Sequence, residues 1–200
     1  MATHTAAYVG GGVDPVESLL AEWRGVGGDG SRVSGREAAR AYLSDFFRRH
    51  AIQSVLRWRH PLLERLGIDE VLTEAGATVT GWEQLEREPP ERRWPQAFAP
   101  QLGITSVDWA VAETGSMALC ARPGQGRVVS LLPPRYLAIV EPDQIVPDLF
   151  DLFEQLEVEK SALPSNIVLV TGPSKTGDIE LKLTTGVHGP GEVHLLVVES

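Results

Sequence analysis

The stretch SGREAARAYLSDFFRRHAIQSVLRWRHPLLERLGIDEVLTEAGATVTGW (Ser34–Trp82) alternates helical and strand-like patterns, and it decides the fold class. Ser34 and Glu37 form a capping box, and the apolar residues that follow recur at helical spacing. The apolar and β-branched runs at 54–59 and 77–82 predict strands, while Pro61 and Gly67 predict the start and stop of a helix between them. This helix–strand–helix–strand order is typical of an α/β domain with a partly parallel sheet.

The length of 200 residues suits one domain. Residues 1–13 are small, polar and glycine-rich, which predicts a flexible N-terminus. Residues 14–200 then form a single domain. Its Arg-, Glu- and Pro-rich segment predicts a surface excursion near 83–102, which we expect Trp94 and Phe98 to pin to the body.

The second half of the chain is richer in strand-like runs. An acidic amphipathic segment is the main exception, and its apolar stripe predicts a helix packed on the sheet. A second, shorter helix is expected after the glycine-rich loop at 172–177. The predicted strands lie at 106–121, on both sides of a turn, and at 128–134, 136–142, 165–172 and 192–198; the predicted helices lie at 143–159 and 177–183.

Composition narrows the possible partners. The formal net charge is −9, with most of the excess acid in the second half. This disfavours duplex nucleic acid, because neutralising phosphates requires a basic face. Cys120 is the single cysteine, so no disulfide can form within the chain, and an iron–sulfur cluster with its roughly four cysteine ligands cannot be held by this chain alone. Without a signal pattern or an apolar run of about 20 residues, we expect a soluble cytoplasmic protein with no cofactor of its own.

The loop after Val170 is the first candidate site. A strand, a glycine turn and a helix start present free backbone N–H groups to an anion. The sequence GPSKTG nevertheless fits neither the P-loop nor the dinucleotide fingerprint. Lys175 can supply a point charge, with Ser174 and Thr176 binding further oxygens. Equally, Thr176 can be a simple helix cap and Asp178 a favourable charge at the helix start, so both interpretations stay open.

The turn AETGS at 112–116 is the second candidate. Glu113 ends an apolar run, where an unpaired carboxylate is costly, so it serves either as a turn anchor or as a general base or substrate-gripping group. His188 lies in GVHGP, between glycines that allow close approach. His188 and His194 could bind a metal with a carboxylate, but a hydrogen-bonded loop histidine and a strand histidine are the favoured interpretation, and no metal site is expected. Cys120 is expected to be a core residue.

Three motifs together point to a family. SVDWAVAETGS, GRVVSLLPPRYLAIVEPDQIVP and VTGPSKTGDIELKLTTGVHGPGEVHLLVV closely resemble the lactate-utilisation protein C family (LutC/YkgG), also called the LUD domain, in order and spacing over about Gly103 to Val198. The chain departs from the family motif at Lys175, where arginine is usual, and at Gly177, where alanine is usual. Lysine keeps the charge but loses bidentate geometry. The resemblance implies a three-layer α/β/α domain with an open, largely parallel sheet, as in the NagB/RpiA/CoA transferase-like fold.

The resemblance also implies a function. The family is linked to bacterial oxidation of L-lactate to pyruvate, together with partner proteins that carry iron–sulfur clusters. We therefore expect clusters only in partner subunits and a small carboxylate or phosphate site in this chain. Two alternatives remain: a free-standing enzyme of the isomerase or CoA transferase-like fold acting on a phosphorylated or carboxylate substrate, or an interaction protein with no such site. Whether the chain is itself an enzyme stays open. The candidate catalytic residues are Glu113, Asp178 and His188, and the candidate anion-binding residues are Thr114, Gly115, Gly172, Ser174, Lys175, Thr176 and Gly177.

Overall fold

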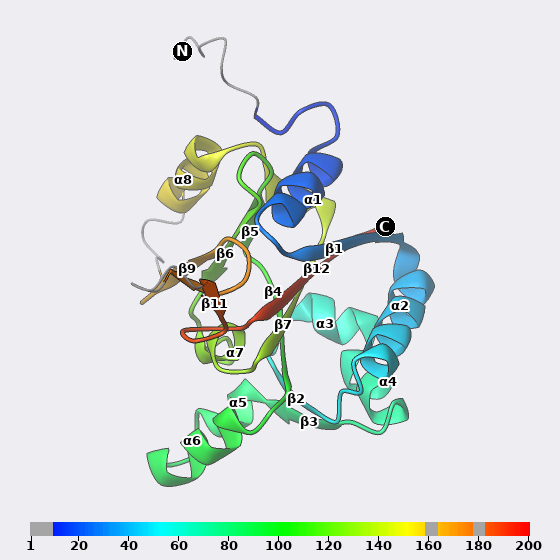
Figure 1. Cartoon of the computed structure of the whole chain (residues 1–200), viewed down its shortest axis with the longest axis vertical. Helices are drawn as coiled ribbons and strands as arrows, with labels where there is room; N and C mark the ends of the chain where they lie inside the picture. The colour runs from blue at the N-terminus through cyan, green and yellow to red at the C-terminus, as the bar shows by residue number, and fades with distance from the viewer. Residues whose placement is uncertain (1–9, 159–163, 178–182) are drawn as a thin grey trace.

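The structure is a computed structural model that describes residues 10–158, 164–177 and 183–200 (Figure 1). Residues 1–9 of the predicted flexible N-terminus lie outside this range. The helices are α1 (Pro15–Gly25), α2 (Gly35–Arg49), α3 (Pro61–Leu66), α4 (Ile68–Glu74), α5 (Trp82–Leu85), α6 (Pro90–Phe98), α7 (Val128–Leu131), the 3-10 turn η1 (Pro142–Gln144) and α8 (Leu149–Val158). The strands are β1 (Asp29–Ser34), β2 (Ser54–Arg57), β3 (Thr78–Gly81), β4 (Leu102–Ser106), β5 (Trp109–Val111), β6 (Ser116–Cys120), β7 (Arg135–Val140), β8 (Ile145–Val146), β9 (Ile167–Val170), β10 (Lys175–Gly177), β11 (Leu183–Thr185) and β12 (Glu192–Glu199).

The main sheet has the order β1-β12-β7-β4-β2-β3, and every neighbouring pair is parallel. Its central strands β4 and β7 are buried apart from Arg135 at the start of β7, as expected for parallel strands covered on both faces. This confirms the prediction of an α/β domain with an open, parallel sheet between two covering layers. The helix–strand–helix–strand pattern at 34–82 is also confirmed, as α2, β2, α3 with α4, and β3.

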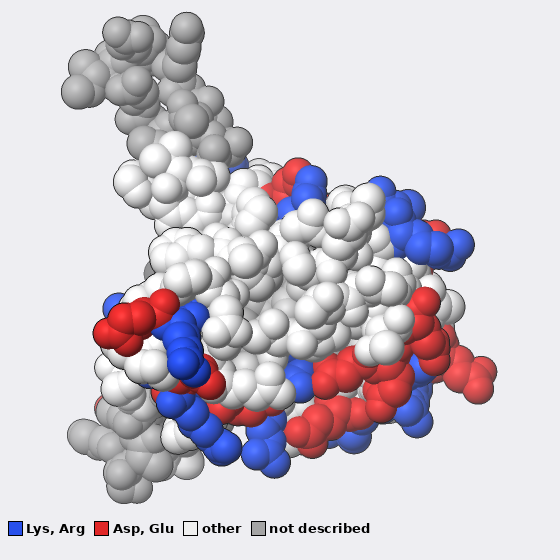
Figure 2. Space-filling view, turned by 90° about the horizontal axis from the view of Figure 1, so that it is seen from below, with Lys and Arg blue, Asp and Glu red and all other residues white. Residues whose placement is uncertain are grey.

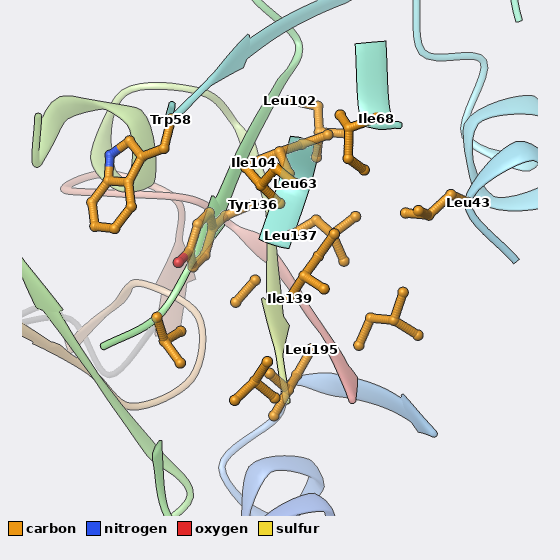
Figure 3. Close-up of a cluster of buried hydrophobic side chains, with 14 of the residues drawn as sticks. Leu43, Trp58, Leu63, Ile68, Leu102, Ile104, Tyr136, Leu137, Ile139 and Leu195 are labelled. Carbon is orange, nitrogen blue, oxygen red and sulfur yellow. The ribbon is translucent and has the colours of Figure 1, made fainter. Parts of the chain in front are cut away.

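One face of the main sheet is covered by α2, α3 and α4 (Figure 1). The buried side chains of α2 are Ala39, Leu43, Phe46 and Phe47, which recur at helical spacing. Leu43 and the α3 residue Leu63 meet sheet residues such as Leu137 in one apolar cluster (Figure 3). The capping box is not formed, because the Ser34 hydroxyl donates to the carboxylate of Glu199 instead. The pairing of β1 with β12 places the Ser34 hydroxyl next to Glu199, so it is not free to cap α2 as the sequence predicted.

The other face is covered by α1, α7 and a second sheet. Gly103 of β4 lies so close to α7 that a Cβ there would be 2.0 Å from the carbonyl oxygen of Val129. Gly103 pairs with Tyr136, and Tyr136 pairs with Val193, so all three belong to this face. The second sheet has the order β8-β5-β6-β9 and is mostly antiparallel. The covering layer on this side is thus mixed, with a sheet as well as helices.

Several predicted elements are corrected. The segment 128–134 is not a strand but contains α7, and β1 forms where no strand was predicted. The predicted helix at 143–159 is shorter, since η1 and β8 precede α8. Its predicted stripe does not bury uniformly: Leu152 is buried, whereas Phe153 is 57% exposed. Phe150, which was not part of that stripe, is 75% exposed.

The excursion near 83–102 contains α5 and α6, at one end of the molecule in Figure 1. The expectation that Trp94 and Phe98 pin it to the body is wrong, because they are 41% and 62% exposed. The segment meets the core through the buried side chains of Leu85 and Ala97. The guanidinium of Arg93 stabilises the segment internally by donating to the carbonyl oxygens of Leu85, Glu86 and Glu88.

The surface is charged with both signs. Figure 2 shows Lys and Arg interleaved with Asp and Glu across the lower part of one face, with few charges over the rest of that face. Among the ion pairs, Arg57 contacts both Asp69 and Glu83. In the described part of the chain, no helix combines the length and apolar composition needed to cross a membrane.

Two loops of the second sheet contact the carboxyl end of α1: the turn at 112–116 and the loop after β9. Gly115, at φ +62°, approaches so closely that a Cβ would lie 2.6 Å from the backbone nitrogen of Trp23. Gly172, at φ +78°, would place a Cβ 2.9 Å from the carbonyl oxygen of Val26. Trp23 is buried, and its indole donates to the Asp29 carbonyl oxygen at 3.0 Å. The two loops can therefore approach α1 this closely only with glycine at both positions.

Gly115→Ala tests this closure against Gly76→Ala, a glycine at φ +80° with open space around it. Both substitutions carry the strain of a positive φ, about 1 kcal/mol or more. We expect Gly115→Ala to lower the free energy of unfolding by roughly a further 1–3 kcal/mol, because its methyl group overlaps the α1 backbone. Urea unfolding of both variants measures the difference. Equal losses would show that α1 and the turn are not in tight contact.

Candidate functional site

A cavity of about 160 Å³ lies between the main sheet and the second sheet. Its walls come from α7, from the starts of β7 and β12, from β9, and from the two arms of the glycine-rich loop that the sequence singled out. The described residues that line it are Ser130, Leu131, Tyr136, Val168, Leu169, Val170, Thr171, Gly172, Ser174, His188, Gly189, Pro190 and Val193.

A chain of hydroxyl groups joins the two candidate loops. The Thr114 Oγ1 donates to the Ser116 Oγ at 2.9 Å, and the Ser116 Oγ lies 2.8 Å from the Thr171 Oγ1. Thr171 follows β9 directly and lines the cavity. The turn at 112–116 and the loop after Val170, far apart in sequence, are therefore brought together as one unit.

Ser174 and His188 are also brought together, but through the backbone. The Ser174 Oγ accepts from the His188 backbone N–H at 3.3 Å, while the Ser174 N–H donates to the Pro190 carbonyl oxygen at 2.9 Å. The His188 side chain is exposed. Nucleophilic catalysis needs a hydroxyl in hydrogen-bond contact with a base, and this contact is to a backbone N–H instead. Ser174 thus holds the two arms of the loop against each other at the edge of the cavity.

The predicted helix start after the loop is wrong. Lys175, Thr176 and Gly177 form β10, which pairs antiparallel with β11. A helix N-terminus with free N–H groups is therefore not available at Gly177, and the anion site inferred from that geometry loses its main donor set. Asp178, assigned to the same site, lies outside the described residues.

Lys175 makes a contact that the sequence did not predict. Its Nζ donates to the carbonyl oxygen of Val26, the C-cap of α1, at 2.5 Å. A cation at the carboxyl end of a helix is stabilised by the helix dipole. The ammonium group has three donors, so this contact leaves capacity for a ligand at the same edge.

The Glu113 carboxylate is not on the cavity wall. Glu113 is half-buried at the turn between β5 and β6, and its backbone N–H donates to the Pro147 carbonyl oxygen at 3.0 Å. Of the predicted site residues, Gly172, Ser174 and His188 line the cavity. Outside the cavity, Gly115 and Lys175 contact the carboxyl end of α1. Glu113 and Thr114 belong to the same turn as Gly115.

Sequence reasoning missed Ser130, Tyr136 and Thr171. The Tyr136 hydroxyl is fully buried and lies 2.6 Å from the Thr105 Oγ1. Burial raises the pKa of Tyr136 well above its usual range, so the phenol stays protonated at neutral pH. A tyrosine at the start of an otherwise apolar strand, and a threonine just after one, were the available signals.

The cavity suits binding by neutral hydrogen-bonding groups. None of the described residues on its wall is Lys, Arg, Asp or Glu, and the wall does not bring together three metal-ligating side chains. Its volume is below the roughly 300–1,000 Å³ typical of drug-sized ligands, so it fits a small polar molecule rather than a nucleotide.

Comparison with solved structures supports the fold. A protein of the DUF162 family from Deinococcus radiodurans superposes with a TM-score of 0.61 over 91% of this chain and 94% of its own, at 18% sequence identity. At that identity the likeness concerns the fold alone.

Comparison with curated sequences finds proteins named lactate utilization protein C. That of Halalkalibacterium halodurans is 34% identical over 75% of this chain and 64% of its own length. That of Bacillus subtilis is 35% identical over 70% and 60%, and that of Macrococcus caseolyticus is 44% identical over 49% and 44%. The matches thus cover less than two thirds of the length of each of these relatives.

The sequence profile of the LUD domain matches residues 16–198, nearly the whole chain. It includes the motifs at 106–116, 126–147 and 170–198 on which the resemblance rested. The chain belongs to the LUD domain family.

Proposed function

We propose that this chain is a component of a bacterial L-lactate utilisation system, in which L-lactate is oxidised to pyruvate together with iron–sulfur partner proteins. The observation that carries the proposal is the family match, joined to the names of the relatives. Lactate oxidation releases two electrons, and the family resemblance assigns their acceptor to iron–sulfur clusters. With Cys120 as its only cysteine, buried in β6, this chain leaves the clusters to its partners.

A partner needs a surface, and α8 offers one. Phe150 and Phe153 are three residues apart and so project from the same side of the helix. Both are largely exposed, although large apolar side chains at this spacing normally pack on a core. Exposed aromatic residues of this kind are enriched at protein–protein interfaces. Acidic residues of the same helix, including Asp151 and Glu154, would make the rim of such an interface polar.

The cavity supports a ligand role within the same proposal. Its neutral hydroxyls and nearby Lys175 suit a small carboxylate, the class that includes lactate and pyruvate. The catalytic roles first assigned to Glu113, Asp178 and His188 remain proposals. The cavity equally favours the second candidate function, a free-standing enzyme acting on a small phosphorylated or carboxylate substrate, because such an enzyme needs the same pocket.

Deletion of the gene in its native host tests the primary proposal. We expect slow or absent growth on L-lactate as sole carbon source, with normal growth on glucose, because only lactate oxidation requires the system. Growth curves on both carbon sources, with the wild-type gene returned on a plasmid, measure the effect. Normal growth of the deletion strain on L-lactate contradicts the proposal.

Ligand binding separates the two candidates. A ligand present at about 100 times its dissociation constant stabilises the protein by about 2.7 kcal/mol. We expect lactate or pyruvate to raise the Tm of the wild type and of Ser44→Ala, a serine outside the cavity, but to have a smaller effect on Ser174→Ala. Stabilisation by a sugar phosphate alone, reduced in Lys175→Ala, would favour the free-standing enzyme. The absence of any shift would favour a protein-binding role.

The α8 surface is tested by co-purification. We expect the double variant Phe150→Ser, Phe153→Ser to keep its Tm but to lose iron–sulfur proteins from pull-downs out of lactate-grown cells, measured by iron content and mass spectrometry. Phe98→Ser, which replaces an exposed phenylalanine of α6, is the matched control. Equal recovery of iron with both variants would show that α8 is not the docking surface.

A further inference from the structure

Three potential metal ligands converge on the opposite face of β12 from the cavity. Side chains alternate along a strand, so Glu192 and His194 share one face while Val193 points to the cavity. That face is the one covered by α2, whose C-cap residue is His50. The ligand atoms of His50, Glu192 and His194 lie within 4.8 Å of one another.

His194 is a buried side chain whose ring nitrogens make no hydrogen bond to the described residues. The residue is 7% exposed, and neither ring nitrogen makes a hydrogen bond. The Oδ2 of Asp29 lies 3.5 Å from Nδ1, which makes it an electrostatic neighbour rather than a well-formed acceptor. The ring instead meets the rings of Phe46 and His50, at centroid distances of 4.8 and 5.1 Å. A buried imidazole without a hydrogen bond is a position at which a native protein can hold a water molecule or an ion.

The carboxylate of Glu192 is already oriented. Arg135 donates to it twice, from Nε to Oε2 at 2.6 Å and from Nη2 to Oε1 at 3.2 Å. A carboxylate has about four acceptor positions, so these bonds leave positions facing the histidines. Carboxylates that bind metals are usually held by such outer hydrogen bonds. Glu192 and Asp29 carry two negative charges and Arg135 carries one positive charge, so the net charge of the group favours a cation.

We propose that His50, Glu192 and His194 bind a divalent transition-metal ion of the zinc type. Two imidazoles and a carboxylate are a common ligand set for such ions, and three protein ligands leave a coordination position for water. Bonds of 2.0–2.2 Å require ligand atoms roughly 3.3 Å apart, so the set must contract slightly. His194 is fixed in the core, whereas His50 is partly exposed and Glu192 exposed, and these two can move. The ion would fasten the end of α2 to the start of β12.

The competing explanation is a pair of ion contacts without a metal. His50 Nδ1 lies 4.0 Å from Glu192 Oε2, and His194 has Asp29 as its neighbour. In that case these contacts account for the arrangement of the side chains, and added metal has no effect on the protein.

Titration of the metal-free full-length chain with Co²⁺ distinguishes the two. We expect one equivalent to bind, with visible absorption bands of a histidine-ligated ion that Zn²⁺ abolishes by displacement. His50→Ala and Glu192→Gln should each weaken Co²⁺ binding at least about tenfold. His188→Ala, which replaces an exposed histidine outside the group, should bind like the wild type. These variants are chosen because truncating the core residue His194 would confound binding with folding.

A second readout checks the assignment. Zn²⁺ should raise the Tm of the wild type and of His188→Ala but not of His50→Ala, and chelator should reverse the rise; circular dichroism confirms that all variants fold. The proposal is overturned if wild type and His50→Ala bind Co²⁺ with equal affinity, or if the wild type shows no saturable binding at micromolar Co²⁺ and no shift with Zn²⁺.

Discussion

A parallel sheet has two apolar faces, and both must be covered before the strands are stable. On one face of this sheet the covering is conventional, because α2, α3 and α4 present helical stripes to it. On the other face it includes a small, mostly antiparallel sheet, which must be fastened in place. The carboxyl end of α1 is the fastening point. There Gly115 and Gly172 allow backbone contact, and the Lys175 Nζ donates to the carbonyl oxygen of Val26, the C-cap residue of the helix.

This constraint changes how the family motifs are understood. In AETGS and TGPSK, the residues Thr114, Gly115, Gly172 and Lys175 all take part in closing the layer. Each has a structural task that would preserve it even without a ligand. The cavity exists because the same closure leaves space between the sheets, lined by Thr171 and others. The residues that hold the second sheet against α1 therefore also shape the cavity, and substitutions at these positions will disturb stability and binding together. Ser174 is more informative, since the hydrogen bond of its side chain among the described residues is to one backbone N–H.

The sequence was sufficient to predict helices and strands where local patterns and tertiary packing agree. The stretch from Ser34 to Trp82 has helical and strand periodicities that match its burial, and its elements were predicted almost to their bounds. β1 was missed because its residues are small and polar, and the strand is formed by pairing with β12 rather than by its own propensity. α7 was misassigned because Val-Val-Ser-Leu is strand-like, whereas close packing of Val129 on Gly103 holds it as a helical turn.

The candidate site was harder to predict for the same reason. Its hydroxyls come from segments separated by tens of residues, and only the fold places Tyr136 and Thr171 on one wall. The helix start expected at Gly177 rested on local pattern, but Gly177 belongs to β10, which pairs with β11. The group formed by His50, Glu192 and His194 left one local signal, a Glu-x-His spacing in a strand. Its third member is reached only through the packing of α2 on β12.

The second sheet links the two parts of the proposed function. α8 packs on β5 and β8 through Leu152, which is buried with Val111, Ala118 and Val146. β9, at the other edge of that sheet, forms a wall of the cavity. A partner docked on the exposed phenylalanines of α8 would therefore rest on the same sheet that encloses a ligand. Because close-packed layers move as units rather than deform continuously, a shift of this sheet on partner binding would change the cavity at its other edge.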